Sequence, residues 1–248
     1  MYNTFPDRKR EFISVPVTES TNNDLKNIIK QSDAPVFAAV TAERQLSGRG
    51  RLGRSFLSPA GGLYFSLAYP LTGDEKNIPF LTLLAGLAVS DAINELTGTA
   101  TLIKWPNDIY LGGRKLGGIL TELISCRGLT AVVGIGINLS EKNFPGELQD
   151  IATSFSREGI TAPDKAALMN SITEKLDRLV YDDGCLYNVK DSLHQKLRER
   201  SFSIGKAVRY NAGNEEIKGI VTDIKNTGAA EITLPDGTKR EIFCGEII

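Results

Sequence analysis

The sequence predicts an α+β protein, with a mixed sheet in a large domain and a small all-β domain after it. Its 248 residues suffice for one large domain and a small appendage. Helical and strand patterns occur in mixed order up to residue 200, whereas short strand patterns separated by turn sequences follow residue 201. We therefore expect domains at residues 1–200 and 201–248.

The first predicted elements are a helix, two strands and a second, longer helix. A helical pattern begins at Ser20 or Thr21, and either hydroxyl can cap it. Residues 36–42 and 63–69 read as strands, with an arginine-rich loop between them. A long apolar helix then runs from Pro79 to the Thr97-Gly98 break, and we expect this helix to lie in the core.

The elements after residue 100 are predicted from the same strand, turn and capping patterns. We expect strands at residues 102–105, 118–125 and 130–139, the last two joined as a hairpin by a tight turn. A capping-box pattern at residues 161–164 predicts a helix that ends near residue 183, and a second helix is expected at 186–200. The small β-domain has predicted strands at residues 207–210, 217–224, 230–234 and 241–248.

Composition narrows the class of protein. A hydrophobic content of 41% and a charged content of 24% are ordinary for globular proteins. We see no continuous apolar run of about 20 residues and no apolar run behind a basic N-terminus. We therefore expect no membrane contact, no signal peptide and a cytoplasmic location.

The few cysteines and the single histidine restrict the chemistry. Cys126, Cys185 and Cys244 are widely spaced, so we expect buried free thiols and no zinc or redox motif. His194 lies in a polar helical stretch, which argues against a histidine-based catalytic triad. A sequence pI near 6.0 argues against a dedicated nucleic-acid binder.

Positive charge is concentrated at residues 44–54, the arginine-glycine loop. This segment holds four arginines and three glycines in a chain of net charge -1. Arginine forks match phosphate or carboxylate, and glycine lets the backbone approach an anion closely. The loop therefore indicates an anionic ligand, with an ordinary solvated surface loop as the alternative.

Further motifs favour the ligand-binding interpretation. ESTN at residues 19–22 precedes the arginine-glycine loop, and KWPND at 104–108, KLGGIL at 115–120 and GIGIN at 134–138 follow it. In this order the motifs resemble those of the biotin protein ligases, from about residue 14 to the C-terminus. The resemblance implies a biotin/lipoate ligase fold with a C-terminal SH3-like β-barrel.

The resemblance also implies a reaction. Biotin would react with ATP and Mg²⁺ to give biotinoyl-5'-AMP, and a lysine of a biotin carboxyl carrier domain would then accept the biotin. Because the biotin carboxylate is already ionised, the chemistry calls for cations rather than a protein base. The biotin site would comprise Ser20, Thr21, Gln45, Gly48, Arg49, Arg51, Lys115 and Gly118, with Arg51 and Lys115 catalytic. The nucleotide site would comprise Arg54, Phe56, Asn107, Asp108 and Asn138, with Asp108 as the metal ligand.

Each of these residues also has an ordinary structural interpretation. Ser20 and Thr21 can be helix caps with no contact to a ligand. Phe56 can be an aromatic side chain of the core. Asn107 and Asp108 can form a simple turn, and Asn138 can terminate a strand.

Two other functions stay open at this point. One is a lipoate-type protein ligase, and the other is a non-enzymatic nucleotide- or RNA-binding module whose loop follows phosphates. About 13 residues precede the matching region, so we expect no helix-turn-helix domain and no DNA binding. Biotin ligases often have a tryptophan before the barrel, whereas residues 193–198 contain none. Whether the protein forms a homodimer is left open.

Overall fold

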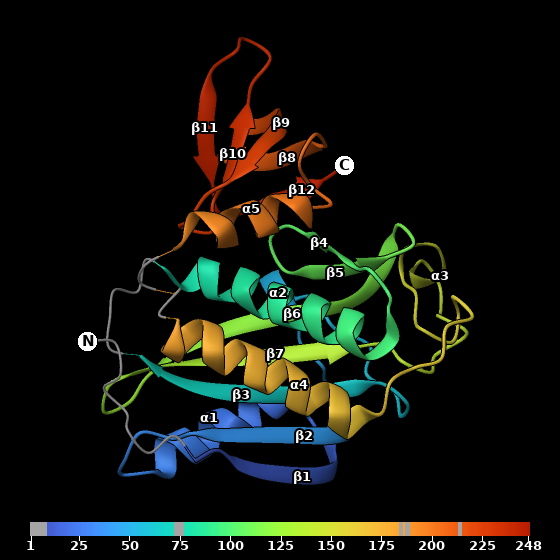
Figure 1. Cartoon of the computed structure of the whole chain (residues 1–248), viewed down its shortest axis with the longest axis vertical. Coiled ribbons are helices and arrows are strands. Elements are labelled where there is room, and N and C mark those ends of the chain that lie inside the picture. The colour runs from blue at the N-terminus through green and yellow to red at the C-terminus, as the bar shows by residue number, and fades with distance from the viewer. Residues whose placement is uncertain (1–8, 72–76, 184–185, 187–188, 213–214) are drawn as a thin grey trace.

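The computed structural model describes residues 9–71, 77–183, 186, 189–212 and 215–248. It contains a larger seven-stranded sheet flanked by helices and a smaller five-stranded sheet near the C-terminus, as Figure 1 shows. The predicted α+β class is therefore confirmed.

The larger sheet is mixed in direction. Its first two strands pair in parallel at one edge, and all its other neighbouring strands are antiparallel. The spatial order is β1 (Glu11–Thr18), β2 (Ala38–Gln45), β3 (Leu63–Leu71), β7 (Leu129–Ile137), β6 (Arg114–Ser125), β5 (Asp108–Leu111) and β4 (Leu102–Lys104). The hairpin of β6 and β7 is as predicted, whereas the sequence did not predict β1 or β5.

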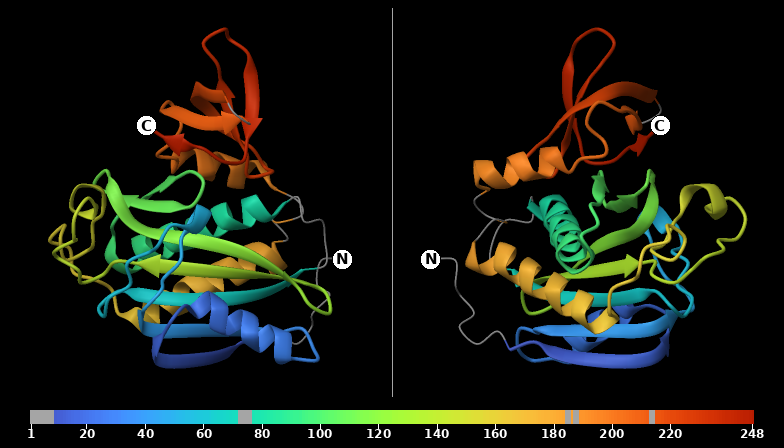
Figure 2. Two further views of the ribbon diagram at one scale, coloured as in Figure 1. Left: turned by 180° about the vertical axis from the view of Figure 1, so that it is seen from behind. Right: turned by 45° about the vertical axis from the view of Figure 1, so that its right-hand side comes forward.

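Helices cover both faces of the larger sheet (Figure 2). One face is covered by α1 (Thr21–Gln31), and the other by α2 (Ile78–Thr97) and α4 (Lys165–Asp177). The short helix α3 (Leu148–Ile151) lies beside β6, and α5 (Asp191–Glu199) packs against the smaller sheet. Side chains of a strand alternate between the two faces of a sheet. In β2, Val40 packs with Leu25 and Ile29 of α1, while Ala39 belongs to the core shared with α2 and α4.

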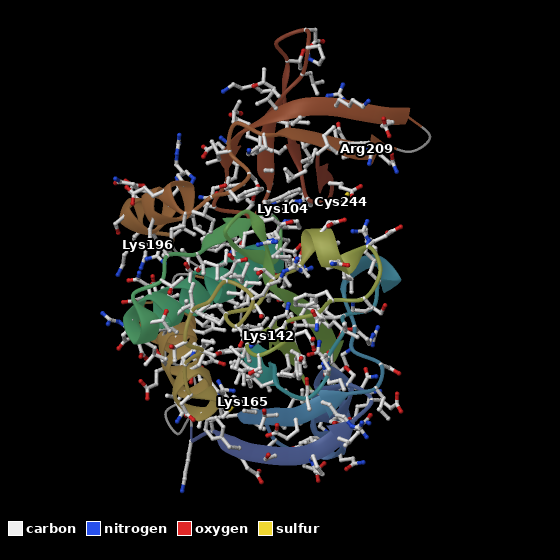
Figure 3. The ribbon with its side chains drawn as sticks, turned by 90° about the vertical axis from the view of Figure 1, so that its right-hand side faces the viewer. Lys104, Lys142, Lys165, Lys196, Arg209 and Cys244 are labelled. Atoms are coloured by element: carbon white, nitrogen blue, oxygen red, sulfur yellow. The ribbon has the colours of Figure 1, made fainter. Side chains whose placement is uncertain are left out.

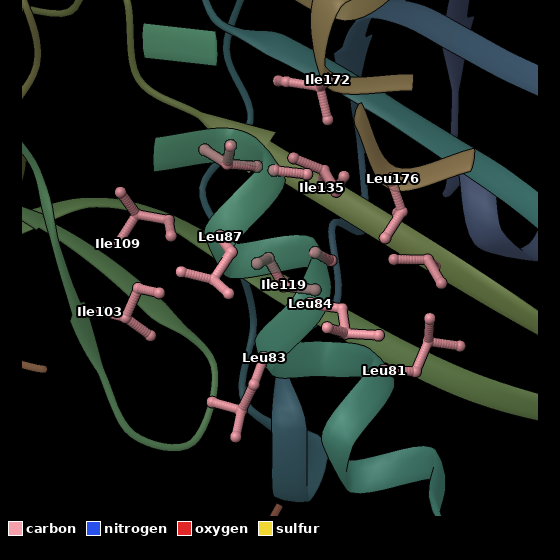
Figure 4. Packing of buried hydrophobic residues seen from close by; sticks show 14 of the residues in the cluster. Leu81, Leu83, Leu84, Leu87, Ile103, Ile109, Ile119, Ile135, Ile172 and Leu176 are labelled. Carbon is pink, nitrogen blue, oxygen red and sulfur yellow. The ribbon is translucent and has the colours of Figure 1, made fainter. Parts of the chain in front are cut away.

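The central element of the core is α2. Leu81, Leu83, Leu84 and Leu87 lie among isoleucines from β4 to β7 and residues of α4, as Figure 4 shows. By length and composition α2 could cross a membrane, although its sequence is not an uninterrupted apolar run. Because 67% of its most apolar window is buried inside the protein, a core position accounts for that composition.

Two local predictions are corrected by the structure. α4 is capped by Asp164, whose side chain accepts a hydrogen bond from the Ala167 amide at 2.9 Å, so Thr161 is not the cap. Cys126 is partly buried and Cys244 is exposed, contrary to the expected burial of the thiols. Cys185 lies outside the described residues.

The smaller sheet is antiparallel. Its strands are β8 (Ala207–Ala212), β9 (Glu215–Ile224), β10 (Ala230–Thr233), β11 (Lys239–Ile242) and β12 (Glu246–Ile247), in the order β11-β10-β9-β8-β12. Val208, Val221 and Ile232 are fully buried between these strands and the rest of the core. The last predicted strand, residues 241–248, is divided into parts of β11 and β12 by a break at residues 243–245.

Candidate active site

A cavity of about 320 Å³ lies between the larger sheet, the arginine-glycine loop and the last strand of the smaller sheet. Figure 3 faces this side of the molecule, with Lys104 and Cys244 near the boundary between the two sheets. Apart from Gly48, every predicted site residue lines the cavity: Ser20, Thr21, Gln45, Arg49, Arg51, Arg54, Phe56, Asn107, Asp108, Lys115, Gly118 and Asn138. The fold thus brings together residues from segments far apart in the sequence.

The start of α1 forms a neutral, hydrogen-bonded part of the cavity wall. Ser20 is buried but its side chain does not cap the helix. Instead, Gln45 Oε1 accepts hydrogen bonds from Thr21 N at 2.9 Å and Thr21 Oγ1 at 3.1 Å. Gln45 Nε2 donates to Ser58 Oγ at 3.0 Å, and Ser66 Oγ donates to Thr21 Oγ1 at 2.7 Å. These polar groups are therefore held in fixed positions.

Glycines leave the sheet beneath the cavity without side chains. A Cβ atom at Gly134 would lie 2.2 Å from Asn22 Oδ1, and one at Gly136 would lie 2.6 Å from Phe56 Cε1. Asn22 and Phe56 therefore pack directly on the backbone of β7. This close packing is a physical reason for glycine in the GIGIN motif.

The arginine-glycine loop is closed by its own backbone. Gly50 N donates to Arg54 O at 2.7 Å, and Phe56 N donates to Gly48 O at 2.8 Å. A Cβ atom at Gly48 would lie 2.3 Å from Phe56 O, so this closure requires glycine at position 48. Gly48 is not among the residues lining the cavity, and its contact with biotin stays a prediction.

Glu122 of β6 connects the loop to α1. Its carboxylate accepts a hydrogen bond from Asn22 Nδ2 at 2.8 Å and lies 2.6 Å from Lys26 Nζ and 3.5 Å from Arg49 Nη2. Burial alone would raise the pKa of Glu122, but the hydrogen bonds from Lys26 and Asn22 and the nearby positive charges together hold it below its ordinary value. Glu122 is therefore an ionised anchor for Arg49.

Two more arginines of the loop, Arg51 and Arg54, extend along the cavity. Arg51 Nη1 lies 3.5 Å from Asn107 Oδ1. Burial lowers the pKa of Arg51, yet a guanidinium remains protonated at neutral pH. Arg54 is more exposed and lies 3.8 Å from Glu246 of β12. The cationic loop thus reaches the edge of the smaller sheet.

Lys115 and Asp108 form an ion pair, with 2.7 Å between Nζ and Oδ1. Lys115 Nζ also lies 5.8 Å from the centre of the Phe56 ring, within cation–π range. Asp108 is the first residue of β5, so the predicted turn ends at Asn107. Asn107 Nδ2 donates to Ile119 O at 3.0 Å and fixes that turn against β6.

Asn138 ends a strand and also reaches the cavity. It follows β7, is buried, and donates from Nδ2 to Thr153 O at 3.0 Å, as expected of an amide that ends a strand. It also lines the cavity.

Sequence reasoning missed several residues that line the cavity. Asn22 belongs to the ESTN motif but was assigned no role. Two further groups come from segments that carry no recognised motif: Phe144, Leu148, Ile151 and Ala152 around α3, and Gly245, Glu246 and Ile247 at the C-terminal end. Only the fold shows that these residues lie at the cavity.

Within the described part of the chain, no group of three or more histidine, cysteine, aspartate or glutamate side chains could hold a metal ion. Asp108 is the cavity carboxylate nearest Lys115. A metal at this place would therefore take most of its ligands from a bound substrate and from water, as Mg²⁺ does at triphosphates.

Comparisons with known proteins agree with this arrangement. Residues 14–140 match the biotin/lipoate A/B protein ligase family, and residues 203–248 match the biotin protein ligase C terminal domain. The chain is 34% identical over 237 residues to the bifunctional ligase/repressor BirA of Bacillus subtilis, covering 93% of this chain and 70% of that protein. It is 31% identical over 229 residues to the biotin--[acetyl-CoA-carboxylase] ligase of Mycobacterium tuberculosis, covering 88% of this chain and 82% of that protein.

A solved structure has the same fold. The biotin protein ligase from Aquifex aeolicus in complex with biotin and ATP superposes with a TM-score of 0.77 and 31% identity, covering 96% of this chain and 97% of that one. The sequence matches span both sheets, and the structural match spans nearly the whole chain. The chain therefore belongs to the biotin/lipoate A/B protein ligase family and, within it, to the biotin protein ligases.

Proposed function

We propose that this protein is an ATP-dependent biotin protein ligase that forms biotinoyl-5'-AMP and transfers biotin to a lysine of a biotin carboxyl carrier domain. One observation carries the proposal. A single cavity has a neutral, hydrogen-bonded wall at the start of α1 and a cationic wall at the arginine-glycine loop and Lys115. The neutral wall suits an uncharged ureido ring, and the cationic wall suits carboxylate and phosphate groups.

In this proposal the neutral wall binds biotin. Ser20, Thr21 and Gln45 offer hydroxyl and amide groups to the ureido head, and burial strengthens such hydrogen bonds. Gly118 keeps the surface of β6 open beside Lys115. Gly48 and Arg49 belong to the loop that closes over the ligand.

The cationic wall promotes adenylate formation. An oxygen of the biotin carboxylate attacks the α-phosphorus of ATP, and the bond from that phosphorus to the bridging oxygen breaks, so that pyrophosphate leaves with the electron pair. Lys115 and Arg51 hold the reacting carboxylate and the phosphoryl oxygens together as negative charge shifts, which requires no proton transfer. Arg54, Phe56, Asn107 and Asn138 bind the rest of the nucleotide.

Asp108 fits a role as a magnesium ligand. Its carboxylate lies in the cationic part of the cavity, where a triphosphate would supply further oxygen ligands. When bound, Mg²⁺ would neutralise phosphate charge. Lys115 holds the Asp108 side chain in place by the 2.7 Å ion pair.

Further parts of the proposal concern organisation and location. We propose residues 1–200 as the domain that binds biotin and ATP, with residues 201–248 as a second domain that completes the nucleotide site or assists transfer. We also propose that the enzyme works in the cytoplasm. A homodimer is compatible with the exposed edge strand β1.

The alternative activities have less support. Residues 203–248 match a domain named for biotin protein ligases, which favours biotin over lipoate. A non-enzymatic RNA-binding role would need aromatic side chains spread along a basic groove. Instead, the cavity is compact, and Arg49 and Lys115 lie beside Glu122 and Asp108.

Transfer to a carrier domain tests the proposal. The protein is incubated with ATP, Mg²⁺, biotin and a purified biotin carboxyl carrier domain, and the mass of the carrier is measured. We expect a mass increase of one biotinoyl group, and no increase when the acceptor lysine is replaced by arginine. An unmodified carrier under conditions where a known biotin ligase modifies it would reject the proposal.

A further inference from the structure

Trp105, the tryptophan of the KWPND motif, is held by the C-terminal part of the chain. Its side chain is 2% exposed, and the residue lines the cavity. Its main-chain N–H donates to Ser203 Oγ at 2.8 Å, and its indole Nε1 donates to Gly228 O at 3.0 Å. Leaving either buried donor without a partner would be costly, so the position of Trp105 depends on these two acceptors.

Gly228 is part of a tight turn between β9 and β10. Gly228 N donates to Lys225 O at 2.9 Å, and Lys225 N donates to Ala229 O at 2.8 Å. A Cβ atom at Gly228 would lie 2.5 Å from Phe80 N and 2.6 Å from Pro79 C, at the start of α2. These neighbours are backbone atoms of the core helix and cannot move as a flexible side chain would. The turn therefore fits between α2 and Trp105 only when residue 228 is glycine.

Trp105 is in turn connected to the cationic part of the cavity. Asn107 and Asp108 follow it within the same motif, and they contact Arg51 and Lys115 respectively. The strand before the motif is also fixed from the C-terminal side, because Ile103 N donates to Arg200 O at 2.8 Å and Phe202 N donates to Ile103 O at 2.9 Å. A displacement of the turn at Gly228 would thus be transmitted to Asn107 and Asp108.

We infer that Gly228 is a positioning residue for the nucleotide site, acting through the indole of Trp105. The inference rests on the proposed function and assigns a specific task to the smaller sheet: its β9–β10 turn sets the place of the KWPND segment. The neutral wall around Thr21 and Gln45 has no contact with this turn in the described hydrogen bonds. The groups offered to the ureido head of biotin therefore depend on the turn less than the nucleotide site does, which Asn107 and Asp108 connect to it.

The chain offers a matched pair of variants. Gly228 and Gly237 both lie in turns of the smaller sheet and both have φ of +84°, so alanine would take a left-handed φ at each. At Gly237 the added Cβ would meet nothing within 4 Å. The difference between Gly228→Ala and Gly237→Ala therefore isolates the contact with α2 and Trp105 from the strain of a left-handed alanine.

The experiment measures the KM values for ATP and for biotin in pyrophosphate exchange, together with intrinsic fluorescence. Trp105 is the single tryptophan of the chain, so fluorescence emission reports its environment directly. For Gly228→Ala we expect a KM for ATP raised about tenfold or more, a clearly smaller rise in the KM for biotin, and a shifted emission maximum. Gly237→Ala should match the unmodified protein in all three.

Ser203→Ala is a second test of whether the position of Trp105 affects ATP binding. It removes the acceptor of the Trp105 main-chain N–H without adding an atom, so it should raise the KM for ATP in the same direction even if Gly228→Ala does not fold. Equal KM values for ATP in Gly228→Ala and Gly237→Ala, or unchanged ATP binding and emission in Ser203→Ala, would overturn the inference. If the unmodified protein binds ATP but shows no biotin-dependent exchange, the proposed function fails, while nucleotide titration of these variants still tests the role of Gly228.

Discussion

Lys115 is the side chain on which the proposed chemistry depends most. Replacing it by alanine removes the cation that faces Asp108 and leaves that partly buried carboxylate without its ion-pair partner. For Lys115→Ala we expect biotin-dependent pyrophosphate exchange to fall about a hundredfold or more, which corresponds to about 3 kcal/mol of lost transition-state stabilisation. Arg51→Ala should also reduce the exchange.

A lysine of the outer surface supplies the control for this prediction. Lys165 pairs with the exposed Glu43 at 2.8 Å and does not line the cavity, so Lys165→Ala should keep normal exchange. Near-normal exchange in both Lys115→Ala and Arg51→Ala would remove these residues from the mechanism.

Glu122 makes stability depend on pH in the acid range. Its pKa is lower in the folded protein than the ordinary value, so the ionised carboxylate stabilises the fold above that ordinary value. This contribution is lost as the pH falls through the folded-state pKa. We expect Glu122→Gln to be less stable than the unmodified protein at neutral pH, with a difference that shrinks as the pH falls below the ordinary carboxyl pKa, as followed by denaturant midpoints. A stability difference that does not change with pH would contradict this.

The sequence predicted which residue types the site contains, but not all of their pairings. Lys115 and Asp108 were predicted separately because β5 has only four residues, too few for a strand pattern to be recognised. Glu122 has no motif signal of its own, and its role depends on Lys26 and Asn22 of α1, the helix that packs on the same face of the sheet. The first pairing follows from the register of β5 and β6, and the second from the packing of α1 on the sheet, neither of which a single sequence reveals.

At the scale of elements, the tip of the arginine-glycine loop is exposed. Leu52 at its tip is 83% exposed and has a left-handed φ of 54°, and the Arg54 side chain is 71% exposed. We expect residues 44–55 to be cleaved by trypsin without ligand and to be protected when biotin and ATP bind, because an anion offsets the repulsion among the arginines. Cleavage elsewhere in the chain is the internal control. Equal cleavage of the loop with and without ligands would contradict the prediction.

Long elements were predicted more successfully than short or edge elements. α2 was found because 20 residues of helical pattern have clear start and stop signals at Pro79 and Gly98. β1 was missed because it is an edge strand, half exposed and interrupted by Pro16. The capping residue of α4 was misplaced by three residues, since Thr161 and Asp164 are both good caps and only the hydrogen bond to Ala167 distinguishes them.

At the scale of the whole molecule, the cavity is completed by both sheets. Gly245, Glu246 and Ile247 of the C-terminal end line it together with residues of the larger sheet, and Arg54 faces Glu246. This contact was not predictable from the sequence, because it joins segments nearly 200 residues apart with no shared motif. Because these C-terminal residues line the cavity, we expect them to affect the active site.

The charges of the smaller sheet predict weak interaction with DNA. Lys225 and Lys239 pair with Glu231, and Arg209 pairs with Glu246, so these cations already have acidic partners. A DNA-binding face needs clustered cations that are available to phosphates. Fluorescence anisotropy with duplex DNA at low and moderate salt should therefore show no sequence-specific binding, and salt-sensitive binding to one sequence would contradict this prediction.

The most direct test of the central claim is exchange of labelled pyrophosphate into ATP, measured with biotin and with lipoate in parallel. The claim is that one cavity brings the biotin carboxylate and the α-phosphate of ATP together. It predicts rapid exchange with biotin, and with lipoate no exchange above the rate without an acid. Exchange that is equal with both acids, that favours lipoate, or that is absent with biotin would contradict the account.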